Sequence, residues 1–404
     1  MKVLIIVDDY LPKSIKVAGK MMHELALELL NSGHIVTVIT PDPDQSELYT
    51  INNFNGVNLL RFRSGRIKNV SKPVRLINEI LLSFRAVRSL SPWLQTNPHD
   101  LIVFYSPTIF WSGLVRYLKK KWKSPSYLIL RDFFPQWVID NGIIGKYSVL
   151  AYLFRFYERK LYQSADAIGI QSPANLKLFS EMYPKILNTQ LLFNWASPLG
   201  IIKRTDQDNI REKYSLQDRI IFFYGGNIGH AQDMRNLLFL AERMLVFKEA
   251  QFVFLGAGDE FQLVQDTIAN KKLTNCLLFP SVSQEIFSSI LSQIDVGLFT
   301  LHPAHKTHNF PGKILGYMQV GIPILGAVNE GNDLKNVIED GNAGLVSLAG
   351  DHETLYQNAL MFLDSKHRKE MGKNARKLLD STFSVSTTAR KIMSVLNKQT
   401  VKRF

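Results

Sequence analysis

The feature that most constrains the fold of this chain is an alternation of short apolar runs with helical patterns. In the first half, seven apolar runs predict strands, at Val3–Val7, Ile35–Thr40, Leu59–Phe62, Leu101–Tyr105, Tyr127–Leu130, Ala167–Gln171 and Gln190–Phe193. Within the predicted helix Lys20–Leu30, the residues Met21, Leu25 and Leu29 share one face. Such alternation is typical of an α/β fold in which helices cover parallel sheets.

The same alternation starts again in the second half. Strands are predicted at Ile220–Tyr224, Gln251–Leu255, Cys276–Phe279, Val296–Phe299 and Pro323–Gly326. Helices are predicted between and after them at Asp233–Phe247, Asp259–Ala269, Gln284–Ile294, Lys313–Val320 and Ser386–Lys398. Two similar-sized Rossmann-like domains follow from this repetition, and turn residues in Asn194–Arg204 mark the join. We predict domains at 1–196 and 197–382, facing across a cleft, with a helix in 383–404 that packs back on the first domain.

The charge of the chain favours an anionic partner. Lys and Arg number 48 against 35 Asp and Glu, and residues 1–200 alone hold 24 basic and 14 acidic side chains. The partner could be a phosphorylated substrate, an anionic membrane face or nucleic acid. Basic and aromatic residues interleave in Arg61–Trp93 and Trp111–Trp122, a mixture that suits the membrane interface. A solvated basic face is the alternative.

Other features bear on location. No apolar run approaches the ~18 residues of a spanning helix. The apolar run at the start is too short for a signal peptide, because Asp8 and Asp9 interrupt it. Cys276 is the single cysteine and shows no metal-ligand spacing. We therefore expect a cytoplasmic protein that binds peripherally to the inner face of the cytoplasmic membrane.

Glycines follow the first strand of each half, where ligands bind in open α/β sheets. Gly19 and Lys20 lie at the start of the first helix. In the second half, Tyr224–Asp233 (YGGNIGHAQD) joins a strand to a helix and contains three glycines. Such a loop allows a tight turn and close backbone approach to a phosphate at a helix N-terminus. Neither segment has the GxGxxG or GxxxxGK[ST] pattern.

Several motifs in order resemble glycosyltransferase family 4, whose members have the GT-B fold of paired Rossmann-like domains. The matching segments are the opening KVLII with AGKMMHELALELLNSGHIVTVIT, then FFYGGNIGHAQ, GAGDE, SQIDVGLFTL and GYMQVGIPILG. The resemblance covers nearly the whole chain. GNIGxAQ with PGKxLxYM is similar to the branch of bacterial surface-polysaccharide transferases that includes N-acetyl-L-fucosamine transferases.

Two departures from that family concern its glutamates. Members usually carry two glutamates eight positions apart, and His308 and Gly316 occupy these positions here. The first glutamate meets the donor sugar in the family, so His308 with the backbone of Asn309 and Phe310 would make that contact. The family's Arg and Lys for the diphosphate are replaced by Asn227 and Gln232. Lys313 and Lys306 are the expected substitutes, and a solvated first-turn lysine is the alternative for Lys313.

The resemblance and the motifs together define an expected site. The catalytic candidates are Asp132, which ends an apolar strand, and His308; a structural pair of Arg131 with Asp132 is the alternative. The expected donor-binding residues are Gly19, Lys20, Gly226, Asn227, Gly229, Gln232, Gly256, Ser281, Val282, Lys306, Asn309, Phe310 and Lys313. No metal and no other cofactor is expected, because family members of this type do not need one.

The resemblance implies a retaining glycosyltransferase of the hexosyltransferase class. We expect it to move a sugar, such as N-acetyl-L-fucosamine, from a UDP-sugar to a polyprenyl-diphosphate-linked saccharide in O-antigen or capsule synthesis. The partners are then this nucleotide sugar, the lipid-linked acceptor and an anionic membrane, and not nucleic acid. Two alternatives remain at this point: an enzyme similar to UDP-N-acetylglucosamine 2-epimerase, and a noncatalytic GT-B scaffold that lost its glutamates.

Overall fold

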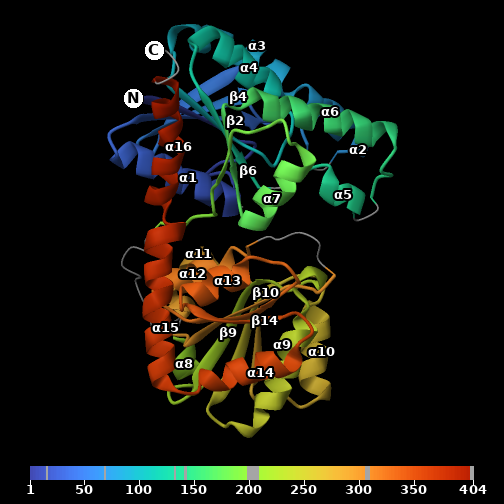
Figure 1. Cartoon of the computed structure of the whole chain (residues 1–404), viewed down its shortest axis with the longest axis vertical. Helices are drawn as coiled ribbons and strands as arrows, with labels where there is room; N and C mark the ends of the chain where they lie inside the picture. Colours follow the sequence, from blue (N-terminus) through green and yellow to red (C-terminus); the bar gives the residue numbers. More distant parts are fainter. Residues whose placement is uncertain are drawn as a thin grey trace. The chain divides into compact units, whose positions relative to one another are not determined.

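A computed structural model describes residues 1–14, 17–67, 70–131, 133–140, 143–197, 209–304 and 310–400, with only the backbone at 137, 140 and 397–400. The chain forms two compact units (Figure 1). The first comprises Met1–Phe193 and Val385–Phe404, and the second comprises Asn194–Ser384. The domain ends expected from the sequence were 196 and 382, whereas the structure divides the chain after 193 and after 384.

The first unit is built on an eight-stranded sheet in the order β3-β4-β2-β1-β5-β6-β7-β8. Its strands are β1 (Lys2–Ile6), β2 (Ile35–Asp42), β3 (Tyr49–Phe54), β4 (Val57–Arg63), β5 (Leu101–Tyr105), β6 (Ser126–Leu130), β7 (Ala167–Ile170) and β8 (Thr189–Leu191). All neighbours are parallel except β3 and β4, which pair antiparallel. The seven strands predicted for this half are confirmed, although their ends differ by a few residues.

Strand β3 is the element of this sheet that the apolar pattern did not predict. Its burial is low at every position, because it lies at the sheet edge with polar residues on both faces. Asn55 and Gly56 connect it to β4, both with positive φ, at 53° and 85°. An Asn-Gly pair with this geometry makes the two-residue turn that suits a hairpin. The Asn-Gly pair was therefore the available signal for this strand.

Helices cover both faces of the first sheet. They are α1 (Val17–Asn31), α2 (Lys72–Ile80), α3 (Leu82–Thr96), α4 (Ser112–Trp122), α5 (Gln136–Asp140), α6 (Val149–Ser164), α7 (Pro173–Met182) and α16 (Val385–Thr400). Leu4 and Ile6 of β1 form one buried cluster with apolar side chains of α3, α4 and α6. Because side chains alternate along a strand, Val3 and Ile5 point to the opposite face, where α1 packs beside α16 (Figure 1).

The second unit has a six-stranded parallel sheet in the order β11-β10-β9-β12-β13-β14. Its strands are β9 (Ile220–Asn227), β10 (Ala250–Ala257), β11 (Cys276–Pro280), β12 (Val296–Thr300), β13 (Ile324–Val328) and β14 (Gly344–Leu348). Its α-helices are α8 (Ile210–Lys213), α9 (Met234–Arg243), α10 (Phe261–Asn270), α11 (Gln284–Leu291), α12 (Lys313–Val320), α13 (Leu334–Asp340), α14 (His352–Met361) and α15 (Ser365–Leu378). Short 3-10 helices lie at His230–Gln232 and Met244–Val246, and a π-helix lies at Leu379–Phe383.

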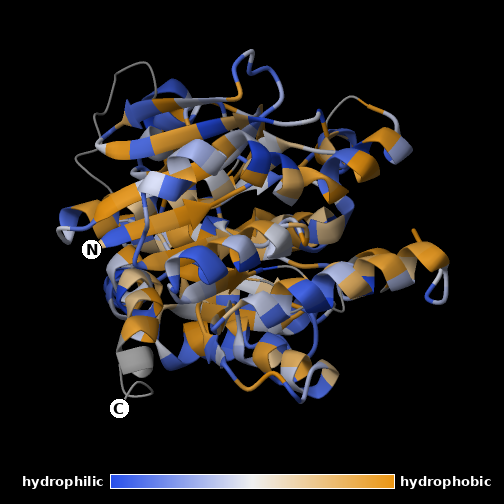
Figure 2. Ribbon diagram, turned by 90° about the horizontal axis from the view of Figure 1, so that it is seen from above, coloured by the Kyte–Doolittle hydropathy of each residue, from blue (hydrophilic) through white to orange (hydrophobic). Residues whose placement is uncertain are grey.

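Hydropathy follows this layering. Figure 2 shows mostly hydrophobic strands, whereas the helices carry alternating hydrophobic and hydrophilic bands. This is the pattern expected when a sheet is buried between helices that each turn one face to water. The two-sheet α/β architecture predicted from the alternation is therefore confirmed. None of the helices that the structure describes is long and apolar enough to cross a membrane.

A buried carboxylic acid lies in the core of the first unit. Glu158 of α6 is only 1% exposed. It accepts hydrogen bonds from the hydroxyl groups of Tyr162 at 2.9 Å and Tyr183 at 2.6 Å. Burial raises the pKa of Glu158 to about 7, and the two tyrosine hydroxyls oppose that rise only in part. Glu158 therefore keeps its proton in the folded chain up to roughly neutral pH.

This raised pKa makes the stability of the first unit depend on pH. In the unfolded chain Glu158 ionises near its ordinary pKa of about 4.3, whereas the folded chain holds the proton up to about 7. The free energy of unfolding should therefore fall as pH rises between those values, by about 4 kcal/mol at most. Glu158→Gln keeps partners for both hydroxyls and should remove this dependence, as urea unfolding at a series of pH values measures.

Glu181→Gln, a change of the same kind at an exposed position of α7, is the matched control. It should leave the pH dependence of the wild type in place. Parallel stability curves for the wild type and Glu158→Gln between pH 5 and 8 would show that Glu158 does not carry the raised pKa.

Candidate functional site

The carboxyl ends of β9 and β10 approach each other so closely that side chains are excluded. A Cβ atom on Gly256 would lie 1.8 Å from the carbonyl oxygen of Gly226. A Cβ atom on Gly258 would lie 2.1 Å from the carbonyl oxygen of Ile228, and the φ of Gly258 is 159°. Glycine is therefore required at 256 and 258 for packing of the two strand ends. The expected donor residue Gly256 has at least this structural role.

Polar side chains gather around Gly229 in the loop that follows β9. The Nδ2 atom of Asn227 donates to Oε1 of Gln232 at 2.6 Å. A Cβ atom on Gly229 would lie 2.6 Å from Oδ1 of Asp259 and 2.8 Å from Nδ2 of Asn227. The structure thus brings three expected donor residues, Asn227, Gly229 and Gln232, into one cluster. Gly226 lies beside it with a φ of 128°, a conformation that favours glycine.

Lys313 approaches the same loop from α12. It is the first residue of that helix, as predicted. Its Nζ lies 3.4 Å from the centre of the Tyr224 ring, and a Cβ atom on Gly226 would lie 3.7 Å from it. Tyr224 is fully buried and its hydroxyl donates to the carbonyl of Asn227. The aromatic ring is therefore held in place below the lysine by the same strand end.

The Nζ atom of Lys313 is buried and has no hydrogen-bond acceptor among the residues that the structure describes. Part of the residue remains accessible, but the nitrogen itself is not. Burial lowers the pKa of Lys313 well below its usual value. The ring face of Tyr224 offers a cation–π contact, which only partly replaces lost hydration. An anion at the glycine loop would supply the missing acceptor.

A second cluster of polar side chains is formed by residues of the loops after β9, β10 and β12. The rings of His230 and His302 lie 4.6 Å apart, and the backbone N–H of His302 donates to the carbonyl of Ala231. Nδ1 of His230 lies 3.5 Å from a carboxylate oxygen of Glu260. We did not predict His230, His302 or Glu260 as site residues. Their positions directly after strands were the available signal.

The remaining expected residues of the second unit take different positions. Ser281 and Val282 follow the edge strand β11, where Ser281 is exposed. Phe310 is buried, with its ring 6.4 Å from that of Phe383. A Cβ atom on Gly316 would lie 3.3 Å from Leu291 of α11, so this position is used for close packing of two helices.

Gly19 and Lys20 belong to the first unit. A Cβ atom on Gly19 would lie 2.8 Å from the hydroxyl oxygen of Ser14, so Gly19 lets the loop after β1 approach α1. Lys20 is exposed and lies 3.9 Å from Glu24 in the next turn. Arg131 is buried and donates to the carbonyl groups of Leu192 at 2.8 Å and Phe193 at 3.1 Å.

Four expected site residues lie outside the part of the chain that the structure describes. They are Asp132, Lys306, His308 and Asn309. Their assignments therefore remain predictions from the sequence. Among the residues that are described, no three His, Cys, Asp or Glu side chains form a group that could hold a metal ion.

Two curated bacterial proteins are similar to the chain over most of its length. WbjE of Pseudomonas aeruginosa, named as a glycosyltransferase, is 24% identical over 338 residues, covering 81% of this chain and 79% of that protein. WcaI of Escherichia coli K12, named as a glycosyl transferase of colanic acid biosynthesis, is 24% identical over 334 residues, with 80% and 82% covered.

A solved structure and two family models match the chain in a way that is consistent with these relatives. The structure of Anabaena HepE in complex with UDP matches with a TM-score of 0.69 at 14% identity, over 98% of this chain and all of that one. The family described as Glycosyltransferase Family 4 matches residues 18–184, and that described as Glycosyl transferases group 1 matches residues 206–378. The chain therefore belongs to the GT-B glycosyltransferases that join a family 4 domain to a group 1 domain.

Proposed function

We propose that this glycosyltransferase transfers a sugar from a UDP-sugar to a lipid-linked oligosaccharide at an anionic membrane, with retention of the anomeric configuration. The product is a bacterial surface polysaccharide such as O-antigen or capsule. The sugar in this proposal is an N-acetylated deoxyhexosamine such as N-acetyl-L-fucosamine. WcaI, named for colanic acid biosynthesis, and the motif branch of the sequence support the polysaccharide part of the proposal.

The observation that carries the donor assignment is the buried Nζ atom of Lys313. It lies beside Gly226 and over Tyr224, and no acceptor of the described chain satisfies it. A diphosphate at the glycine loop would accept a charge-assisted hydrogen bond from this lysine. The complex of HepE with UDP supports the choice of a uridine nucleotide.

The chemistry needs this charge because the leaving group is an anion. As the bond between sugar and diphosphate breaks, negative charge grows on the departing phosphate oxygen. A preorganised cation in a water-poor site stabilises that charge without reorganisation during the reaction. We assign this part to Lys313 rather than to a metal ion. The departing phosphate oxygen then helps to take the proton of the acceptor hydroxyl, and Asp132 assists it as a base. His308 contacts the donor sugar.

The first unit is assigned to the acceptor. Residues 1–200 carry 24 basic and 14 acidic side chains, which matches a diphosphate-linked acceptor at an anionic bilayer. The protein in this proposal is cytoplasmic and binds peripherally to the inner face of the membrane. Aligning two bound substrates supplies much of the rate enhancement in such a reaction.

Lys313→Met tests the donor site. Methionine keeps an unbranched stem over the Tyr224 ring but removes the ammonium group. UDP affinity should fall by about 10- to 100-fold, the range expected for a hydrogen bond to a charged group. The melting temperature should stay the same or rise, because the free site no longer contains a buried amine that lacks an acceptor among the described residues. Calorimetric titration with UDP and thermal unfolding measure the two effects.

Lys366→Met is the matched control, since Lys366 also lies in the first turn of a helix of the second unit but is exposed. It should leave both UDP affinity and melting temperature unchanged. A Lys313→Met protein with the UDP affinity of the wild type would contradict the assignment of Lys313 to the diphosphate.

The lowered pKa of Lys313 predicts that UDP binding takes up a proton. In the free site burial favours the neutral amine, and the bound diphosphate favours the ammonium form. UDP affinity should therefore fall as pH rises, and up to about one proton should be taken up per UDP at pH 8. Titrations in buffers of different ionisation enthalpy measure this number. The phosphate of UDP is itself ionised at that pH.

Lys313→Arg separates this effect from other titrating groups, because a guanidinium stays protonated. The proton uptake at pH 8 should disappear in that variant even if affinity changes little. Equal uptake by the wild type and Lys313→Arg would assign the proton to another group.

Asp132→Asn tests the acceptor side. The amide keeps the shape of the side chain but cannot accept a proton, so turnover should fall by about 100-fold or more. UDP affinity should remain unchanged. Turnover within a few fold of the wild type would make Asp132 a structural residue and leave the phosphate as the only base.

A further inference from the structure

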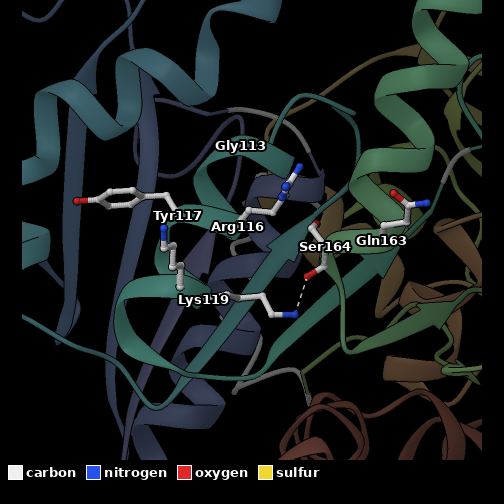
Figure 3. Close-up of a pocket in the computed structure, with 7 residues that line it drawn as sticks. Gly113, Arg116, Tyr117, Lys119, Gln163 and Ser164 are labelled. Atoms are coloured by element: carbon white, nitrogen blue, oxygen red, sulfur yellow. Dashed lines mark hydrogen bonds between the residues drawn. The ribbon is translucent and has the colours of Figure 1, made fainter.

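The first unit carries an open pocket between α4 and α6 that the donor site does not use. It has a volume of about 510 Å³ and is lined by Gly113, Arg116, Tyr117, Lys119, Lys120, Gln163 and Ser164 (Figure 3). We call it the α4–α6 pocket. These residues belong to α4 and α6, and three of them, Arg116, Lys119 and Lys120, are cationic. The pocket is therefore suited to an anionic group.

The charges around this pocket are only partly compensated. Lys119 donates to the carbonyl of Ser164 at 3.1 Å and lies 2.8 Å from Asp166, so its charge is paired. In the part of the chain that the structure describes, no carboxylate pairs with Arg116 or Lys120. A guanidinium fork beside a lysine matches the geometry and charge of a phosphate group.

Helix α6 extends the same surface with an exposed apolar stripe. Val149 is 86% exposed, Tyr152 58% and Phe156 54%. At about 100° per residue, these three and Gln163 of the pocket fall within one sector of the helix of about 60°. We call Val149, Tyr152 and Phe156 the α6 stripe. Exposed apolar residues are ordinary when scattered singly, but a contiguous stripe indicates an interaction surface.

Basic side chains flank the α6 stripe. Arg155 lies to one side of it and Lys160 to the other, with Lys160 placed 5.4 Å from the Phe156 ring. Together α4 and α6 carry seven Lys or Arg and one acidic residue, the buried Glu158. The helices α1 and α16 of the opposite face carry four basic and two acidic residues. The basic excess is therefore concentrated on the α4 and α6 side.

We propose that the α4–α6 pocket binds the phosphate of an anionic lipid while the α6 stripe inserts into the interface of the same bilayer. An apolar stripe between basic flanks is complementary to a membrane whose surface is anionic and whose interior is apolar. Phe156 and Gln163 are about 10 Å apart along the helix, so one flat surface reaches both. This inference deepens the proposed function, because it rests on a lipid-linked acceptor that holds the enzyme at a bilayer.

Vesicle flotation tests both halves of the surface. The probe is phosphatidylcholine vesicles with and without an equal part of phosphatidylglycerol. The wild type should bind only the anionic vesicles. Arg116→Glu with Lys120→Glu should weaken that binding by about 25-fold or more, since each basic residue contributes about fivefold. Tyr152→Ser with Phe156→Ser should weaken it on the order of tenfold, from the apolar area left in water.

The matched control is Lys366→Glu with Lys369→Glu, which makes the same charge change at exposed positions of α15 in the second unit. This control should retain wild-type binding. Equal loss in the control would mean that net charge, and not this surface, governs binding. Undiminished binding by either of the other two double variants would overturn the proposal for that half of the surface.

A fluorescent label locates the contact directly. Cys276 is the single cysteine and is only 7% exposed, so a Phe156→Cys protein should take an environment-sensitive dye at position 156 alone. Its emission should shift to the blue on anionic vesicles, whereas the same dye on Val246→Cys, an exposed site of the second unit, should not shift. The opposite pattern would place the membrane contact elsewhere.

Two further measurements separate the possible failures. If soluble glycerol phosphate stabilises the wild type but anionic vesicles do not bind it, the pocket is a site for free phosphates and the membrane proposal is wrong. UDP affinity and sugar transfer to a short soluble acceptor test the proposed function independently. If both persist while wild-type vesicle binding is absent, only the present inference fails.

Discussion

The structure of the second unit depends on the close backbone approach of two strand ends. The carbonyl of Gly226 occupies the space where a side chain at position 256 would lie. The ends of β9 and β10 can therefore pack this closely only because residue 256 is glycine. The exposed end of β9 then carries Gly226 and Asn227, and the buried Gly229 follows in the loop. Lys313 enters below it from α12, and its nitrogen is buried over Tyr224 without an acceptor among the residues that the structure describes. The packing of the described elements thus leaves a buried amine unsatisfied.

A buried amine of this kind is costly to protonate in the free protein and useful beside a bound anion. Desolvation favours the neutral amine, so in our proposal the donor diphosphate and a proton bind together. The first unit uses charge differently. There the basic side chains lie on the surface of α4 and α6, and in our proposal an anionic membrane binds them. The second unit therefore has a single buried lysine at its proposed site, whereas the first unit has several basic residues distributed over α4 and α6.

Much of this could be predicted from the sequence. Most strands followed from buried apolar runs, but β14 was not among those predicted. Helix α12 has the predicted ends Lys313 and Val320. Strand β3 was missed because it is a polar edge strand whose signal is the Asn-Gly turn after it. Lys313 was predicted as a diphosphate ligand from the family resemblance, as a substitute for the Arg and Lys that this sequence lacks. Its burial over Tyr224 was not, because that contact joins residues of two distant elements and depends on their packing.

The central claim is that Lys313 supplies the positive charge for the donor diphosphate. A crystal structure of the protein with bound UDP tests it most directly. The account predicts a phosphate oxygen within about 3 Å of Nζ of Lys313, with the lysine still over the Tyr224 ring. It also predicts that the diphosphate lies against the backbone of Gly226–Gly229. A structure in which the diphosphate binds elsewhere, and Nζ of Lys313 still has no anionic partner, would contradict the account.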